Sequence, residues 1–128
     1  MNKEILFLFF IAFLFFTILY LIPIAYWIIA KRTGLKVTLK DLLIMRLKRI
    51  HLKKMISVLA MAKEGDIDID LKRMQDHYKS GGDVTNVTIG LIAAKTANIK
   101  YSIDEAFADD EQGINIFEKI KDMAQNRK

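Results

Sequence analysis

The sequence predicts a mainly α-helical protein, in which one N-terminal apolar helix is followed by a small helical domain. Three observations carry this prediction. Residues 5–30 contain no charged side chain, as in a segment that crosses a lipid bilayer. The residues after them combine apolar positions at helical spacing with helix-capping side chains. They also match themselves at an offset of 32 residues, the size of a helix-turn-helix repeat unit.

The apolar segment Ile5–Ala30 is long enough to span a membrane. Its 26 residues would extend about 39 Å as a helix, and a hydrocarbon core of about 30 Å needs only about 20 residues. A core helix of a soluble domain would need apolar neighbours on every side, which so short a remaining chain cannot supply. A signal peptide would have a shorter apolar core and small residues at a cleavage site. We therefore predict a membrane anchor over residues 1–30.

Aromatic residues and one proline mark the C-terminal part of the anchor. Tyr20, Tyr26 and Trp27 fit the aromatic belt that membrane helices place at the bilayer interface. Pro23 interrupts the helix because it lacks a backbone N–H. A kinked spanning, single-pass transmembrane helix is the simplest interpretation. The alternative is a re-entrant hairpin that turns near Pro23 and leaves both termini on one side of the membrane.

Positive charge is concentrated directly after the anchor. Residues 31–54 hold nine Lys or Arg and one Asp, whereas residues 55–128 hold ten basic and thirteen acidic residues. By the positive-inside rule, this asymmetry places the C-terminal domain in the cytoplasm and the anchor in the cell (inner) membrane. The absence of cysteine agrees with a cytosolic domain.

Three roles are open for the basic segment 31–54. It orients the anchor, it lies on the anionic leaflet, where each Lys or Arg near the surface contributes about 1 kcal/mol, or it binds nucleic acid. Nucleic-acid binding would need aromatic or base-reading residues beside the cluster, and none is present. We therefore predict a lipid-bilayer partner with anionic lipids, and no nucleic acid. The residues expected to contact anionic lipid are Lys31, Arg32, Lys36, Arg46, Lys48, Arg49, Lys53 and Lys54.

Apolar periodicity predicts the helices of the soluble part. Residues 31–54 are a basic juxtamembrane region, with a helix that begins at Thr38 and has Leu39, Leu42, Leu43, Leu47 and Ile50 on its apolar stripe. Further helices are predicted over 52–64 (with Gly65 as its stop), 70–79, 83–97, 102–111 and 114–124. Residues 55–124 thus form a helical repeat domain, and residues 125–128 a frayed tail.

The offset of 32 aligns three short motifs. Residues 35–39, 67–71 and 99–103 each have two alternating apolar residues, a residue type that caps helices, and another apolar residue. Arg49 stands where the second and third copies have glycine. We predict about three helix-turn-helix-like repeats with short extended stretches, each burying its apolar face against its neighbour. The expected caps and turns are Thr38, Asp70, Gly81, Gly82, Asp83, Ser102 and Gly113.

The sequence offers no residue set suited to metal binding or catalysis. The aspartates of Asp66–Asp70 alternate like the start of a calcium loop, but Leu71 and His77 stand where its glycine and bidentate glutamate belong. His51, the other histidine, has no ligand spacing to His77. Gly81-Gly82 precedes a helix without the Lys-Ser/Thr of a phosphate-binding loop. We predict no metal, no cofactor and no enzymatic activity.

Several stretches resemble a known family. Met45–Arg49 follows the membrane segment, and His77–Val84 is followed by Val87, Leu91–Ala94, Ala97 and Ile99. In order and spacing these resemble the N-terminal part of the bacterial flotillin-like FloA family, over nearly the whole chain. Two motifs depart from the family pattern. Its Leu-Ala-Gly-Gly-Asn-Val is Lys79–Val84 here, and its Leu-Ala-Gly-Arg-Asp-Val is Glu111–Ile116 here.

The resemblance implies a non-enzymatic scaffold or adaptor that organises membrane proteins or lipids at the cytoplasmic face. Family members continue into a band-7 (SPFH) domain and a helical, oligomer-forming tail, and we expect this chain to lack both. We therefore expect a stand-alone relative that docks onto a full-length flotillin-like or NfeD-type homologue, with a homo-oligomer as a further expectation. The alternative is a small single-span membrane regulator that binds a soluble partner protein or a ligand through its helical domain.

Overall fold

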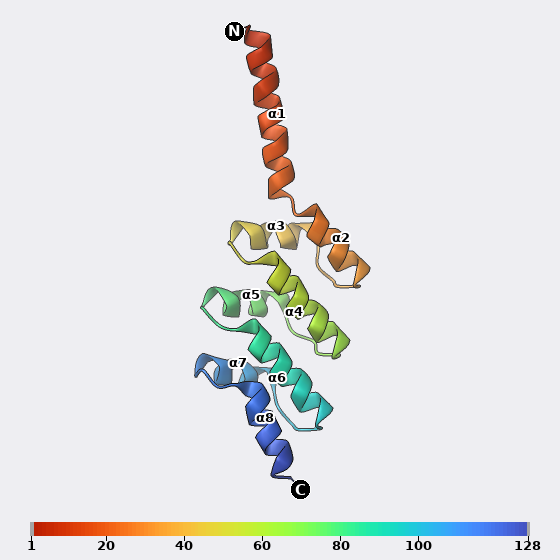
Figure 1. The fold of residues 1–128 in the computed structure, drawn as a ribbon, viewed down its shortest axis with the longest axis vertical. Coiled ribbons are helices and arrows are strands. Elements are labelled where there is room, and N and C mark those ends of the chain that lie inside the picture. Colours follow the sequence, from red (N-terminus) through yellow and green to blue (C-terminus); the bar gives the residue numbers. More distant parts are fainter. Residues whose placement is uncertain (1, 128) are drawn as a thin grey trace. The chain divides into compact units, whose positions relative to one another are not determined.

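The computed structural model describes residues 2–127, and every regular element in that range is a helix (Figure 1). The prediction of a mainly α-helical fold is confirmed. The chain divides into two compact units, Met1–Leu52 and Lys53–Lys128, and each is described by itself. The helices are α1 (Lys3–Leu21), α2 (Ile24–Arg32), α3 (Leu39–Leu47), α4 (Leu52–Glu64), α5 (Leu71–Lys79), α6 (Val84–Thr96), α7 (Ile103–Glu111) and α8 (Ile116–Gln125).

Capping side chains begin two helices of the first unit. The Asn2 side chain accepts a hydrogen bond from the N–H of Glu4 at the start of α1. α3 begins with a capping box, in which the Thr38 hydroxyl accepts from the Asp41 N–H at 3.1 Å. The Asp41 carboxylate accepts from the Thr38 N–H at 3.0 Å. This reciprocal pair starts the helix at the position expected from the sequence.

The small core of the first unit lies where α2 contacts α3. Ala30 of α2 and Leu42 and Met45 of α3 are fully buried. The expected apolar stripe is wrong at Leu47, which is 67% exposed, whereas Ile50, its last member, is buried. Helical periodicity places Leu47 on the stripe, but burial needs a neighbouring element, and none in the first unit covers this last turn.

The boundary between the units falls in the first turn of α4. The bounds of α4 agree with the predicted 52–64, and the helix ends directly before Gly65, as expected. Asp66 takes the left-handed conformation (φ 55°), and the N–H of Ile67 donates to the carbonyl of Ala62 at 2.7 Å. These features close the end of α4 as a left-handed C-cap does, without glycine at the left-handed position. Residues 67–70 then lie outside any helix or strand.

α6 is the central helix of the second unit and contacts α5, α7 and α8. Six of its thirteen residues are buried and four more are half-buried, so most of its circumference faces protein. Gly90 allows the closest of these approaches. A Cβ atom built on Gly90 would lie 2.1 Å from the Cγ2 atom of Ile116 in α8, so any larger residue would push the two helices apart.

α8 begins and ends later than expected. It starts at Ile116, after Asn115, whose side chain accepts from the Glu118 N–H at 3.2 Å. Gln125 is still helical, so the expected frayed tail over 125–128 begins no earlier than Asn126. The Nη1 atom of Arg127 donates to the carbonyl of Ala97 at 3.1 Å. Lys128 lies outside the described residues.

Corresponding helix boundaries are evenly spaced along the chain. α3, α5 and α7 begin at residues 39, 71 and 103, and α4, α6 and α8 at residues 52, 84 and 116, so each start follows the previous one by 32 residues. Left-handed residues recur at the same interval, and Arg49 takes φ 60° where later turns have Gly81 and Gly113. That conformation costs a residue other than glycine about 1–2 kcal/mol. Even spacing agrees with repeated units, whereas the repeat itself stays a prediction.

Gly90→Ala is expected to destabilise the second unit, although alanine favours helices over glycine by about 1 kcal/mol. The added methyl would overlap Ile116, and relieving such overpacking costs about 1–3 kcal/mol. Thermal unfolding followed by circular dichroism should therefore show a lower Tm for the variant. Ser57→Ala, at an exposed position of α4, is the control and should leave the Tm unchanged or slightly raised. A higher Tm for Gly90→Ala would contradict the close approach of α6 and α8.

Candidate functional site

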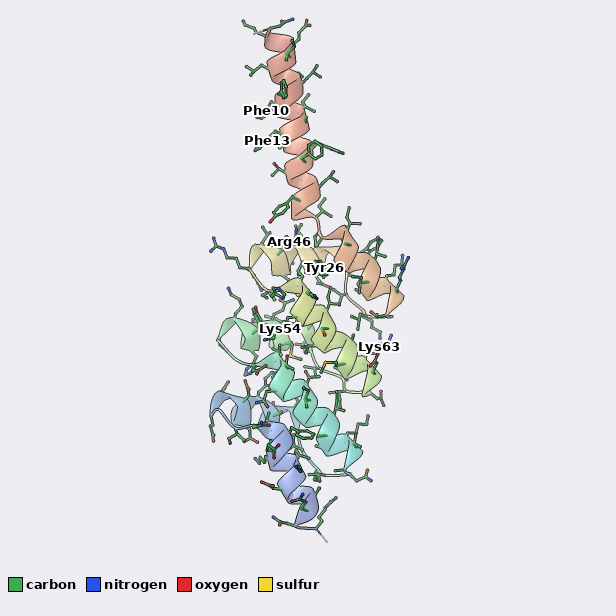
Figure 2. The ribbon with its side chains drawn as sticks, in the orientation of Figure 1. Phe10, Phe13, Tyr26, Arg46, Lys54 and Lys63 are labelled. Atoms are coloured by element: carbon green, nitrogen blue, oxygen red, sulfur yellow. The ribbon has the colours of Figure 1, made fainter. Side chains whose placement is uncertain are left out.

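The surface of α1 is apolar and exposed on all sides. Its large side chains from Ile5 to Tyr20 are exposed, with Phe13 at 72%. Figure 2 shows Phe10 and Phe13 extending from α1 with no other part of the first unit beside them. By length and composition, the helical stretch Lys3–Arg32 is the one among the described residues that could cross a membrane. A bilayer would supply the apolar surroundings that the protein does not.

Pro23 divides this stretch into α1 and α2. It has no N–H to donate to the carbonyl of Leu19, so the helical ladder stops there. The N–H of Ile24 donates to the carbonyl of Ile22 at 2.9 Å, which leaves the Tyr20 carbonyl without its usual helical donor. A re-entrant hairpin would bring α2 back alongside α1, whereas Figure 1 shows α2 running on past the end of α1.

Arg46 on α3 supplies the missing donor. Its Nη1 atom donates to the Tyr20 carbonyl, and the guanidinium carbon lies 5.5 Å from the centre of the Tyr20 ring. This charge-assisted bond caps the C-terminal end of α1, where the helix macrodipole favours a cation. From the sequence, Arg46 was expected only to contact lipid. The structure shows that its guanidinium also connects α3 to the end of α1.

The other basic residues expected to contact lipid are all exposed. Lys31 lies over Trp27, with its Nζ atom 4.9 Å from the ring centre, and Tyr26 and Trp27 are half-buried. The charge is divided between the two units, because Lys53 and Lys54 belong to the second. The exposed set is Lys31, Arg32, Lys36, Lys48, Arg49, Lys53 and Lys54.

The expected caps of the second unit differ in what their side chains do. The Asp83 carboxylate accepts from the backbone N–H groups of the first turn of α6, and the Ser102 hydroxyl accepts from the Glu105 N–H at 3.0 Å. Asp70 occupies the N-cap of α5 without a capping hydrogen bond from its side chain. Gly81 (φ 92°) and Gly113 (φ 76°) are left-handed turns.

A buried side-chain cluster forms around His77 of α5. The His77 Nε2 atom lies 2.6 Å from the Asp110 Oδ2 atom of α7, and both side chains are almost inaccessible. The His77 ring packs edge-on against Phe107, with 4.7 Å between ring centres. Gly82 is required here, because a Cβ atom on it would lie 2.2 Å from the His77 Nε2 atom. In the sequence, His77 was noted only for its lack of metal-ligand spacing, and the pairing with Asp110 was missed.

Asp110 also receives hydrogen bonds from α6. The Asp83 N–H donates to its Oδ2 atom and the Asn86 Nδ2 to its Oδ1 atom, both at 2.8 Å. Burial by itself would raise the pKa of Asp110. The hydrogen bonds from Asn86, Asp83 and His77 outweigh that effect and hold the pKa below its usual value. Asp110 is therefore held as a buried carboxylate that joins α5, α6 and α7.

Asn86 extends this cluster to the start of α8. Its Nδ2 atom donates to the Ile114 carbonyl at 2.8 Å, and its Oδ1 atom accepts from the Ile116 N–H at 3.1 Å. The sequence analysis did not single out Asn86. Its only signal was a polar side chain in the first turn of an otherwise apolar helix, which does not identify a partner 30 residues away.

A smaller cluster joins the segment before α7 to α8. The Asp109 carboxylate accepts from the Lys119 Nζ atom at 2.6 Å and from the Tyr101 hydroxyl. The hydrogen bond from Lys119, together with that from Tyr101, lowers the pKa of Asp109. Burial and the hydrogen bond to Asp109 raise the pKa of the Tyr101 hydroxyl well above its usual value. Tyr101 therefore stays protonated as a donor at neutral pH.

The surface between α6 and α8 forms a groove, here called the α6–α8 groove. Ile89 and Phe117 line both of its two parts. The part of about 770 Å³ lies by the N-terminal ends of the two helices and includes Asp83, Asp110 and Glu111. The part of about 470 Å³ lies toward the C-terminal ends. It is lined by Ile89, Ile92, Ala93, Thr96, Ala97, Phe117, Ile120, Lys121 and Ala124.

The buried polar groups near the groove are engaged in structural hydrogen bonds. Among the described residues, no buried side-chain nitrogen or oxygen atom lacks a hydrogen-bond partner. Within residues 2–127, no three His, Cys, Asp or Glu side chains are grouped so that they could hold a metal ion. What the second unit presents is apolar surface with charged ends, which is suited to holding another molecule.

The model of the family described as flotillin-like protein FloA matches residues 4–127. This chain belongs to that family. A FloA protein of Alkaliphilus metalliredigens is 35% identical over 104 residues, which cover 81% of this chain. One from Dictyoglomus turgidum is 34% identical over 101 residues, and one from Staphylococcus aureus strain Newman is 32% identical over 100 residues, each covering 78% of this chain. The resemblance drawn from the sequence motifs is confirmed.

The matched regions are a minor part of these FloA relatives. They cover 32%, 31% and 30% of the three proteins, so the chain spans about a third of the length of the curated relatives it matches. No solved structure matches the chain.

Arg46→Gln is expected to loosen α1 relative to α3, because the Tyr20 carbonyl loses its charge-assisted donor. Hydrogen bonds to charged groups contribute about 1.5–3 kcal/mol, enough to change the populations of alternative arrangements roughly tenfold. The chain has no cysteine, so spin labels at Phe16→Cys and Lys40→Cys can report the distance in lipid nanodiscs. The distance distribution should broaden in the variant. Lys36→Gln also removes one positive charge nearby and should leave the distance distribution narrow. An unchanged distance distribution for Arg46→Gln would refute the cap.

Acid is expected to destabilise the second unit through Asp110. Its folded pKa lies below the unfolded value of about 3.9, so its stabilisation is complete above that value and is lost as pH falls through the folded pKa. Asp110→Asn should lower the unfolding free energy by about 1–3 kcal/mol at pH 7 and flatten its decline below about pH 5. Urea titrations across this range measure both effects. Asp122→Asn, an exposed site on α8, is the control; equal curves for Asp110→Asn and the parent chain would count against the network.

Proposed function

We propose that this chain is a non-enzymatic, membrane-anchored scaffold or adaptor of the flotillin-like type. It gathers membrane proteins or lipids at the cytoplasmic face of the cell membrane. The observation that carries the proposal is an unburied apolar helix followed directly by a basic region and a helical unit with an apolar surface groove. Membership of the FloA family supports the same class of function.

The charge pattern supports the orientation in this proposal. Nine basic residues and one acidic residue follow the anchor within residues 31–54, and such segments stay on the cytoplasmic side. The exposed cations Lys31, Arg32 and Lys36 are available to anionic headgroups. Arg46 has a second role in this account, because it also holds the end of α1.

The partners in this proposal are other membrane proteins, among them a full-length flotillin-like or NfeD-type homologue and further copies of this chain. The exposed surface of α1 is suited to contacts inside the bilayer, and the α6–α8 groove to contacts outside it. The second candidate function is a regulator that holds one soluble protein or ligand. The groove favours it too, since apolar surface with charged ends also fits a soluble partner.

When the chain is purified from bacterial membranes in mild detergent, membrane proteins are expected to accompany it in near-stoichiometric amounts. A matched variant replaces residues 5–30 with an unrelated apolar span of equal length. It stays in the membrane and shows whether capture depends on the anchor or on the helical units. Recovery of a clean monomer from the parent chain would overturn the scaffold proposal. Recovery of one soluble protein alone would favour the regulator.

A further inference from the structure

We propose that the α6–α8 groove binds a single amphipathic helix of a partner membrane protein. The helix carries branched apolar side chains along one face, acidic residues in its first turn and basic residues in its last turn. This inference rests on the proposed scaffold function, for which it names the binding surface and the chemistry of the partner. The groove consists entirely of residues of the second unit.

The α6–α8 groove is open because no side chain in it corresponds to Ile92, which fills the junction between α4 and α6. Between α4 and α6, Gly65 faces Ile92 so closely that a Cβ atom on Gly65 would lie 2.7 Å from the Ile92 Cγ1 atom. The positions 32 residues further on are Ala97 and Ala124, and both line the groove. Alanine lacks the branched side chain of isoleucine, so the junction of α6 with α8 keeps an unfilled apolar hollow.

Large apolar side chains at the middle of the groove remain in contact with water. Ile89 is 38% exposed and Phe117 is 47% exposed, and these two residues line both parts of the groove. An aromatic and a branched aliphatic side chain beside a hollow of about 470 Å³ match the way a groove receives a helix. In that mode, side chains at positions i, i+3 or i+4, and i+7 of the bound helix enter the groove.

The two ends of the groove carry opposite charge. Asp83 and Glu111 line the end by the N-termini of α6 and α8, and within residues 2–127 no Lys or Arg lines that part. Lys121 lines the other end, and Arg127 is held there by its hydrogen bond to the Ala97 carbonyl. A bound helix with basic residues at one end and acidic residues at the other would complement both ends.

Helix electrostatics decide the direction of the bound helix. Basic residues stabilise a helix at its C-terminal end, and acidic residues do so at its N-terminal end. The basic end of the bound helix must face Asp83 and Glu111, which lie by the start of α8. The helix therefore runs antiparallel to α8, and its acidic first turn faces Lys121 and Arg127.

The size of the groove fits one helix better than a second copy of the chain. α8 has ten residues, so the groove follows about 15 Å of helix. A stable protein dimer buries about 800 Å² on each partner, far more than one side of so short a helix offers. Three turns of a single helix would cover the hollow, Ile89 and Phe117.

The test uses a synthetic peptide of about 14 residues, with isoleucines on one face, glutamates in the first turn and lysines in the last. A second peptide of the same composition exchanges the glutamates and lysines. Binding to the full chain in zwitterionic nanodiscs is measured by fluorescence anisotropy, with empty nanodiscs as the blank. The first peptide should bind roughly tenfold more tightly than the second. Glu111→Lys should reverse this preference, and Glu64→Lys, an exposed site at the end of α4, should keep it.

Three results would overturn the proposal. Equal binding of both peptides to the parent chain and to Glu111→Lys would show adsorption without recognition. Undiminished binding to Ala93→Arg, which fills the hollow at a half-buried position, would place the peptide elsewhere. A concentration-dependent dimer that Ala93→Arg abolishes would identify a second copy as the occupant. These binding measurements use no cellular protein. A negative result in them can therefore be told apart from the recovery of a clean monomer, which is the result that would overturn the scaffold function.

Discussion

The carboxylate of Asp110 organises the second unit. It lies on α7, pairs with His77 of α5 at 2.6 Å, and accepts hydrogen bonds from Asp83 and Asn86 at the start of α6. Its side chain is 5% exposed, so little water competes for these charge-assisted bonds. Asn86, held by Asp110, in turn binds the backbone at the start of α8 through Ile114 and Ile116. The position of α8 on α6, and with it the α6–α8 groove, therefore depends on one buried carboxylate.

A comparable constraint acts in the first unit. Pro23 ends the helical ladder of α1, and a carbonyl left without a donor costs several kcal/mol where water is absent. Arg46 of α3 supplies a donor at this helix end, through its hydrogen bond to the Tyr20 carbonyl. A cation of the basic cluster therefore has a structural role, because it holds α1 against α3.

Local features of the chain were predictable because they depend on residues close in sequence. The capping box of Thr38 with Asp41 and the cap at Ser102 each involve partners three residues apart. The start of α6 after Asp83 and the bounds of α4 followed from periodicity in the same way. Details within these turns were not predictable, because several residue types are compatible with each position. Asp66 takes the left-handed position after Gly65, and Asp70 occupies the N-cap of α5 without a side-chain hydrogen bond.

The sequence by itself determined the apolar segment, the basic region after it, the helical class and the family, because these depend on composition and order along the chain. Only the tertiary structure decided which side chains meet. The partners of Asp110 lie 24 to 33 residues away, and Arg46 lies 26 residues from Tyr20. Periodicity names the face of a helix that is apolar, but burial depends on whether another element covers it. This is why Leu47 is exposed and why Ala97 and Ala124 leave a groove open.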